Sequence, residues 1–130
     1  MSRPSDVGSL KVGSYVLMDN EPCRIVEYSK SKPGKHGSAK ARLVAIGIFD
    51  GTKRSIVKPV NGQVEIPIIE KKTGQVISIM TRALQLMDLE TFDIFEIPIP
   101  EEELKSKLTS GIEVEYWRIL DKIKIMRIKG

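Results

Sequence analysis

The side chains that could do chemistry are concentrated in one lysine-rich segment of the first half. Residues 29–40, SKSKPGKHGSAK, hold four lysines and the only histidine of the chain, but no acid and no large apolar residue. Such a segment has nothing to bury, so it is predicted to project from the fold as a loop. Pro33 and Gly34 favour a turn and Gly37 permits a second one. Lys35 is therefore expected at or near the tip, between small residues that let another molecule approach closely.

Catalytic and metal-binding arrangements fit this segment poorly. A phosphate-binding P-loop needs an earlier glycine and a Ser or Thr after its lysine, whereas Lys35 is followed by His36. Cys23 lies in a predicted strand well before the loop, so it is interpreted as a small buried residue and a Cys23–His36 dyad is disfavoured. One Cys and one His are too few ligands for a structural zinc site. No segment combines a nucleophile, a base and an orienting group, which predicts that the chain is not an enzyme.

Period-two alternation predicts strands through most of the chain. Cys23, Ile25 and Glu27 are expected on one face of a first strand, opposite Arg24, Val26 and Tyr28. Leu43, Ala45, Gly47 and Phe49 are expected on one face of a second. Turn signals separate the strands. They are Asp19-Asn20-Glu21-Pro22, Asp50-Gly51 before a strand over 53–58, and Asn61-Gly62. Many short strands without a helical period favour a small closed barrel.

A joint is predicted at residues 67–73, where a proline precedes a charge cluster, and a new alternation begins at Gly74. Strands are expected over 75–80, 83–88 and 91–97. Pro100 and three acids then favour a helix start, with Leu104 and Leu108 on a buried face and Gly111 as the stop. Two strands follow, around 112–116 and 122–125. Three strands, one short helix and two strands is the order expected of an OB-fold barrel.

Charge and composition narrow the class of protein. Residues 1–68 hold 11 Lys or Arg and 6 Asp or Glu, a net charge of +5, whereas residues 69–130 hold 10 and 11, a net charge of −1. The first half is thus expected to carry contacts with polyanions. The longest apolar run, 43–49, is too short to cross a bilayer, and the N-terminus lacks the apolar core of a signal peptide. A single cysteine fits a reducing compartment, so a cytoplasmic protein is expected.

The string SKPGKHGSAKARLVAIGIFDG, residues 31–51, resembles the signature of the translation initiation factor 5A family, the hypusine-containing proteins. The resemblance extends over essentially the whole chain. The short N-terminus of the chain and its excess of basic over acidic residues are similar to the archaeal branch of the family. Pro33 departs from the eukaryotic pattern, which usually has threonine there. The resemblance implies an all-β chain in two domains. Residues 1–69 would form an SH3-like barrel carrying the loop 29–40, and residues 70–130 an OB-fold barrel with one short helix.

The resemblance also implies a mechanism. Lys35 would receive an aminobutyl group from spermidine through deoxyhypusine synthase, with or without a later hydroxylation, and no other cofactor. The factor would bind the ribosome, contacting large-subunit rRNA and peptidyl-site tRNA, and would promote peptide-bond formation at the first bond or at consecutive prolines. No membrane and no DNA partner is expected. The loop residues expected to serve modification and RNA contact are Lys30, Lys32, Pro33, Gly34, His36, Gly37 and Lys40.

Two simpler interpretations of the function remain beside the one that the resemblance implies. The loop alone is also typical of a solvated basic hairpin that binds phosphates without specificity. The OB-like half could instead make the chain a general single-stranded RNA-binding protein, which would require a basic groove with exposed aromatic rings in residues 69–130. Trp117 and Tyr116 are interpreted as core or barrel-rim residues, and the net charge of this half counts against that function.

Overall fold

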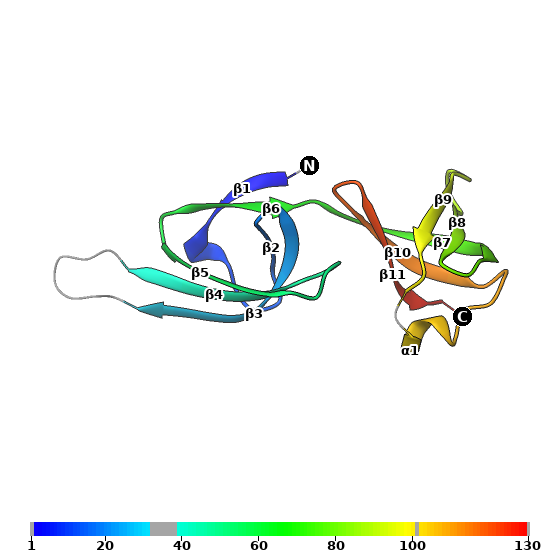
Figure 1. Cartoon of the computed structure of the whole chain (residues 1–130). Coiled ribbons are helices and arrows are strands. Elements are labelled where there is room, and N and C mark those ends of the chain that lie inside the picture. The colour runs from blue at the N-terminus through cyan, green and yellow to red at the C-terminus, as the bar shows by residue number, and fades with distance from the viewer. Residues whose placement is uncertain (1, 32–38, 101, 130) are drawn as a thin grey trace. The chain divides into compact units, whose positions relative to one another are not determined.

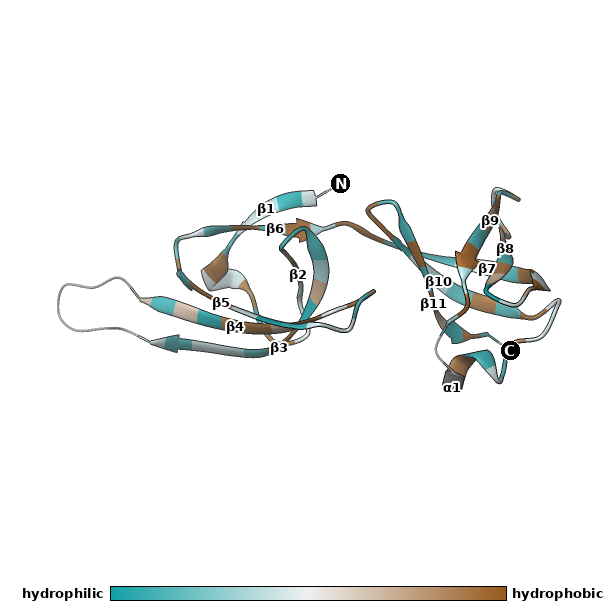
Figure 2. Ribbon diagram, viewed as in Figure 1, coloured by the Kyte–Doolittle hydropathy of each residue, from teal (hydrophilic) through white to brown (hydrophobic). Residues whose placement is uncertain are grey.

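The computed structural model describes residues 2–31, 39–100 and 102–129. The chain folds as two compact units, Met1–Ile68 and Ile69–Gly130. Both units are built almost wholly from antiparallel strands, which confirms the all-β prediction. Along these strands hydrophobic and hydrophilic residues follow one another in short bands (Figure 2), because alternate side chains point to opposite faces of a sheet.

The first unit is an SH3-like barrel made of two sheets (Figure 1). The larger sheet has the order β2-β3-β4-β5 and the smaller one pairs β1 with β6, all antiparallel. A 3-10 turn, η1 (Val7–Ser9), follows β1. The strands are β1 (Ser2–Asp6), β2 (Tyr15–Met18), β3 (Glu21–Ser31), β4 (Lys40–Gly47), β5 (Lys53–Pro59) and β6 (Gln63–Pro67).

Most residues of the face predicted for β4 are buried in the core of this barrel. Leu43 and Ala45 are fully buried and Gly47 is buried as well, but Phe49 lies beyond the end of the strand and is half-buried. The core also receives apolar side chains from η1, β2, β3 and β6. Its buried members are Val7, Leu10, Val16, Met18, Cys23, Ile25, Ala41, Leu43, Ala45 and Val64.

Strand β3 departs from the predicted alternation at one residue. Ile25 pairs with Ala45 while Glu27 pairs with Val44, so Val26 is an extra residue in the ladder. A bulge of this kind shifts the side-chain phase. Cys23 and Ile25 are buried as predicted, but placing Glu27 on their face was wrong, because Glu27 is exposed. Tyr28, predicted on the face opposite Cys23 and Ile25, instead packs against the same core.

Two of the predicted turns close hairpins of the larger sheet. Asp19 and Asn20 connect β2 and β3 with φ angles of 53° and 63°, the left-handed conformation that a two-residue hairpin turn requires and that Asp and Asn tolerate. Asp50 and Gly51 connect β4 and β5, and Gly51 has a φ of 65°. The Oδ1 atom of Asp50 accepts a hydrogen bond from the backbone N–H of Thr52 at 3.0 Å, which fixes this turn.

The second unit is an OB-fold barrel whose five-stranded sheet has the order β11-β10-β7-β8-β9. In the described part of this unit one short helix, α1 (Glu102–Lys105), lies between the third and fourth strands, as predicted. The strands are β7 (Ile69–Ile79), β8 (Ala83–Asp88), β9 (Ile94–Pro98), β10 (Glu113–Ile119) and β11 (Lys122–Ile128). Its buried core is formed by Val76, Leu84, Leu86, Ile97, Leu108, Val114, Tyr116 and Ile125.

Three boundaries in this unit differ from the prediction. The joint is much shorter than residues 67–73, because β7 already begins at Ile69 and its charged residues pair with β10 from Ile69↔Ile119 onward. Strand β9 begins at Ile94 rather than residue 91, since the preceding residues form a turn. Gly111 is not a helix stop: α1 has ended six residues earlier, and Gly111, with a φ of 92°, forms the turn into β10.

Candidate functional site

The predicted loop leaves the first barrel from the ends of two long paired strands. The predicted loop bounds, 29–40, were too wide, because the ladder between β3 and β4 continues through the pairs Ser29↔Arg42, Lys30↔Ala41 and Ser31↔Lys40. Polar side chains do not prevent this pairing, since it uses backbone groups. Lys30 and Lys40 therefore lie on adjacent strands at the base of the loop, and both are exposed. The remaining predicted residues lie outside the described part of the chain. They are Lys32, Pro33, Gly34, Lys35, His36 and Gly37.

Strand β5 braces the β4 side of this base. Lys40 pairs with Pro59 at the end of β5. One residue further, the backbone N–H of Val60 donates to the carbonyl of Ala39 at 3.0 Å, and the N–H of Gly8 donates to the carbonyl of Val60 at 2.8 Å. The segment that enters β4 is thus tied through β5 to η1.

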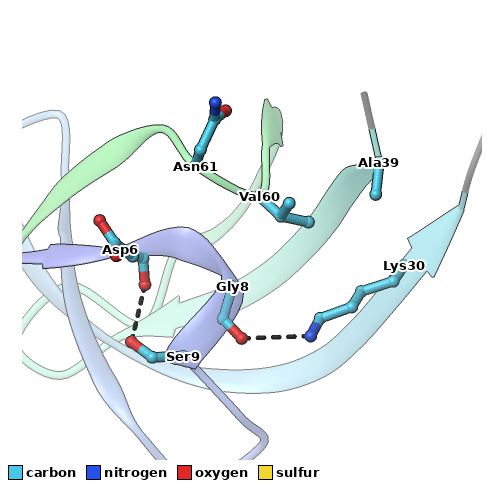
Figure 3. Close-up of a pocket in the computed structure, with 7 residues that line it drawn as sticks. All are labelled: Asp6, Gly8, Ser9, Lys30, Ala39, Val60 and Asn61. Carbon is cyan, nitrogen blue, oxygen red and sulfur yellow. Dashed lines mark hydrogen bonds between the residues drawn. The ribbon is translucent and has the colours of Figure 1, made fainter. Parts of the chain in front are cut away.

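Tyr28 and Lys30 brace the β3 side against the same turn. The hydroxyl of Tyr28 donates to the carbonyl of Val7 at 3.0 Å. The ammonium of Lys30 donates to the carbonyl of Gly8 at 3.1 Å, as Figure 3 shows. The same ammonium lies 5.7 Å from the centroid of the Tyr28 ring. Both strands that hold the loop are therefore anchored to one point, and this gives the loop a fixed base.

An open pocket of about 500 Å³ lies beside this base. Figure 3 shows Lys30 and Ala39 on one side of it and η1 with the β5–β6 turn on the other. Sequence reasoning identified Asn61-Gly62 as a turn, but it gave no signal that this turn and η1 meet at the loop. The pocket is lined by Asp6, Gly8, Ser9, Lys30, Ala39, Val60 and Asn61.

The two side-chain ties at the base should differ in strength. Tyr28→Phe is expected to lower the free energy of unfolding of the first unit by about 1 kcal/mol, because it removes a partly buried hydrogen bond to the carbonyl of Val7, although this carbonyl still accepts from the N–H of Leu10 at 3.2 Å. Lys30→Met should cost less, since its exposed hydrogen bond is readily replaced by water. Amide hydrogen exchange of β3 and β4 measures both. A larger loss for Lys30→Met than for Tyr28→Phe would contradict this ranking.

A second polar cluster surrounds the predicted buried cysteine at the opposite end of the β3–β4 ladder. Arg54 donates to both carboxylate oxygens of Asp50, at 3.2 and 2.8 Å, and these hydrogen bonds lower the pKa of Asp50 to about 2. Burial raises the pKa of the Cys23 thiol despite the nearby Arg54 guanidinium. The thiol donates to the carbonyl of Glu21 at 3.3 Å. A buried thiol with a raised pKa is a poor nucleophile, which supports the structural role predicted for Cys23.

The aromatic residues of β10 are placed in the interior of the second unit. Tyr116 is 1% exposed and Trp117 is 8% exposed, so neither offers a free face for stacking on bases. The ammonium of Lys71 lies 4.7 Å from the centroid of the Trp117 ring. These positions agree with the interpretation of both rings as core or barrel-rim residues, with Tyr116 in the core cluster of this unit, and they count against the general single-stranded RNA-binding function.

The described residues hold neither a metal-ligand cluster nor a membrane-spanning helix. No cluster of three or more His, Cys, Asp or Glu side chains with the geometry of a metal site occurs in residues 2–31, 39–100 and 102–129. Within the same ranges, no helix has the length and apolar character needed to span a bilayer.

The fold and the braced basic hairpin define a class: two-domain β proteins with an SH3-like barrel followed by an OB-fold. A family model described as "Translation initiation factor 5A-like, N-terminal" matches residues 1–61, and one described as "Eukaryotic elongation factor 5A hypusine, DNA-binding OB fold" matches residues 68–129. The chain belongs to the translation initiation factor 5A family, as its loop signature predicted, and is thus a factor of protein biosynthesis.

Relatives with this name are similar over nearly their full length. The chain is 58% identical over 127 residues to translation initiation factor 5A of Thermococcus sibiricus, covering 95% of this chain and 92% of the relative. It is 56% identical over 130 residues to that of Thermofilum pendens, covering 99% and 98%. A solved structure, eukaryotic translation initiation factor 5A from Methanococcus jannaschii, shares 49% identity with a TM-score of 0.90, covering 98% of this chain and 95% of that one.

Proposed function

We propose that this protein binds the ribosome and promotes peptide-bond formation through an aminobutyl-modified Lys35. The modified arm would orient the acceptor end of peptidyl-site tRNA, at the first peptide bond and where consecutive prolines slow the ribosome. Membership of a translation factor family supports the ribosomal setting. The description of the matching second-half model names hypusine, which supports the modification.

The proposed modification requires a partner enzyme and a donor of the aminobutyl group. Deoxyhypusine synthase would recognise the loop, and the ε-nitrogen of Lys35 would form a new bond to the aminobutyl carbon of spermidine. The C–N bond inside spermidine would break, and the propane diamine that remains would leave. The sequence carries the small residues Gly34 and Gly37 close to this lysine, which would let an enzyme active site close over it.

The single observation that carries the proposal is the braced base of the loop. Hydrogen bonds from Lys30 and Tyr28 to η1 and from Val60 to Ala39 hold both strands that enter the loop. A fixed base reduces the freedom that an arm must lose when it enters a narrow RNA-lined cleft. The added aminobutyl group roughly doubles the reach of a lysine and supplies a second positive charge on a slim stem.

The basic residues of the base would hold rRNA phosphates without reading sequence. Lys40 and Arg42 are exposed on β4 and suit this role. Lys30 donates one hydrogen bond to Gly8, and an ammonium has three donors, so it can brace the loop and contact a phosphate together. Catalysis would remain with the ribosome, and the factor would contribute by positioning the substrate, which lowers the entropic part of the barrier.

The direct test is the mass of the peptide that contains Lys35, taken from the protein purified from its native cell. The expected result is a gain of one aminobutyl group, with or without one oxygen. Peptides containing Lys30 or Lys40 from the same digest serve as controls and should carry no addition. An unmodified Lys35 in this native material would contradict the proposal and leave an ordinary basic loop on a translation factor.

A further inference from the structure

An aromatic side chain is displayed at the turn between β8 and β9 of the second unit. Phe92 is 67% exposed, more than any other large hydrophobic residue among those described. Its φ angle is 65°, in the left-handed region that glycine and asparagine occupy readily and a bulky aromatic residue rarely does. Leu120 has a similar φ of 57° but is half-buried, so its side chain has a packing role that Phe92 lacks.

The turn holds Phe92 in this conformation through hydrogen bonds on both sides. The N–H of Phe92 donates to the carbonyl of Asp88 at 2.8 Å, and the N–H of Asp88 donates to the carbonyl of Asp93 at 2.9 Å. The hydroxyl of Thr91 donates to the carboxylate of Asp93 at 3.1 Å. The buried carboxylate of Asp88 accepts from the N–H of Glu90 and of Thr91, each at 2.8 Å. A costly conformation fixed this firmly is typical of sites whose strain serves a function.

A second exposed apolar residue follows the turn. Ile94, the first residue of β9, is 58% exposed. It pairs across the strands with Met87, which is half-buried. We call Met87, Phe92 and Ile94 the Phe92 patch. The patch lies at the open edge of the sheet, because β9 is the last strand in the order β11-β10-β7-β8-β9.

The surroundings of the patch are strongly acidic. Glu90, Asp93 and Glu96 are all exposed and lie within four residues of Phe92 in the sequence. From residue 83 to residue 104 the chain holds seven Asp or Glu and no Lys or Arg. The nearby cations of other segments each have a partner of their own. The guanidinium of Arg118 lies 4.9 Å from the ring of Phe95, the ammonium of Lys72 lies 3.6 Å from the carboxylate of Glu70, and Lys129 donates to the hydroxyl of Thr73 at 2.7 Å. An acidic rim repels phosphates, so this patch is unsuited to a nucleic acid.

We propose that the Phe92 patch is a docking site for a basic segment of a partner protein. The segment would place an apolar side chain against Phe92 and Ile94 and Lys or Arg side chains against Glu90 and Asp93. Exposed aromatic residues are the usual energetic centre of a protein interface, and a charged rim of opposite sign sets orientation and rate of association. The proposal does not depend on the modification of Lys35.

The test uses the full-length chain and defined fluorescent peptides of equal length. One peptide alternates Lys with Leu and Phe, a second replaces Lys with Glu, and a third keeps Lys but replaces the apolar residues with Ser. Fluorescence anisotropy should show that the basic apolar peptide binds at least about tenfold more tightly than the other two, and that its affinity falls with rising salt. Equal binding of the acidic apolar peptide would overturn the proposal, as would binding of a single-stranded RNA that Phe92→Ser weakens, because that loss would place the RNA on the patch rather than on the basic first unit.

Variants separate binding from stability. Phe92→Ser and Ile94→Ser should each weaken the basic apolar peptide at least about tenfold, whereas Val57→Ser, at a 61% exposed valine of the first unit, should not. Phe92→Gly should weaken binding equally but leave the melting temperature unchanged or higher, because glycine relieves the left-handed strain. A clear fall in melting temperature for Phe92→Gly would assign Phe92 a structural role and overturn the proposal.

Self-association of the wild type that is lost in Phe92→Ser would also overturn the proposal, because it would assign the Phe92 patch to a second copy of the chain.

Discussion

Lys35→Arg is expected to abolish the proposed function while leaving the fold and the melting temperature unchanged. The guanidinium of arginine stays protonated and delocalised, so it offers no amine nitrogen that can accept the aminobutyl group. The positive charge at position 35 is kept, which means that a loss of function cannot be attributed to weaker attraction to phosphates. The buried core found among the described residues of the first unit is formed by side chains of the strands, of η1 and of Leu10.

The measurement has two parts. Growth of cells that depend on the variant reports overall function, and a reporter with a run of proline codons reports the slow peptide bonds directly. Lys40→Arg is the matched control: it makes the same chemical change at an exposed lysine five residues away, and it should support normal growth. If Lys35→Arg supported growth and proline-run translation as well as Lys40→Arg does, the loop would act as a basic surface and the modified arm would have no role.

The signals that predicted the site were local ones. The loop was predicted because a run of lysines and small residues has no apolar side chain to bury. The hairpin turns at Asp19-Asn20 and Asp50-Gly51 were predicted because Asp, Asn and Gly tolerate left-handed backbone. The order of strands around one short helix was also visible from alternation and from the acids that precede Leu104. Each of these inferences uses residues close together in the chain.

The features that the sequence did not reveal depend on pairing between distant residues. The bulge at Val26 shifts the phase of β3 because of its register with β4, and alternation within one strand cannot locate it. Glu70–Thr73 were assigned to a joint because charge clusters are typical of linkers, yet these residues form a strand that pairs with β10. The tie between Lys30 and Gly8 spans 22 residues, so no local pattern indicated which element braces the loop.

A buried long-range polar contact was also invisible to local patterns. Asp88 is 1% exposed and accepts a hydrogen bond from the hydroxyl of Tyr116, which is 28 residues away and itself 1% exposed. In the sequence, Asp88 is only the polar end of an alternating strand. Its buried position shows that the β8–β9 turn, which displays Phe92, is built on a carboxylate inside the barrel.

Asp88→Ala is expected to lower the free energy of unfolding of the second unit by about 3 kcal/mol. The substitution leaves the Tyr116 hydroxyl and the N–H groups of Glu90 and Thr91 without an acceptor in or near the core, and each such loss costs about 1–3 kcal/mol if water cannot replace it. Asp88→Asn should cost less, because its amide oxygen can still accept from the two N–H groups. Urea unfolding followed by the fluorescence of Trp117 reports this unit, since Trp117 is the only tryptophan in the chain.

The hydrogen bond between Tyr116 and Asp88 also predicts that the free energy of unfolding of the second unit falls at low pH. Burial would raise the pKa of Asp88, but the hydrogen bonds from Tyr116, Thr91 and Glu90 outweigh it and lower the pKa to about 2. A carboxyl with a lowered folded-state pKa stabilises the fold fully above its unfolded value near 3.8, and this stabilisation is lost as the pH falls towards 2. The expected loss between pH 5 and pH 2 is about 2 kcal/mol.

Asp88→Asn provides the control for this pH effect. The variant keeps every other titrating group, including Asp50, whose pKa is also lowered to about 2 in the first unit. The difference in free energy of unfolding between wild type and Asp88→Asn should therefore isolate Asp88, and it should shrink as the pH falls from 5 to 2. A difference that stayed constant over this range would show that the Asp88 carboxylate is not stabilised by Tyr116 and the turn, and that the loss in Asp88→Ala reflects packing alone.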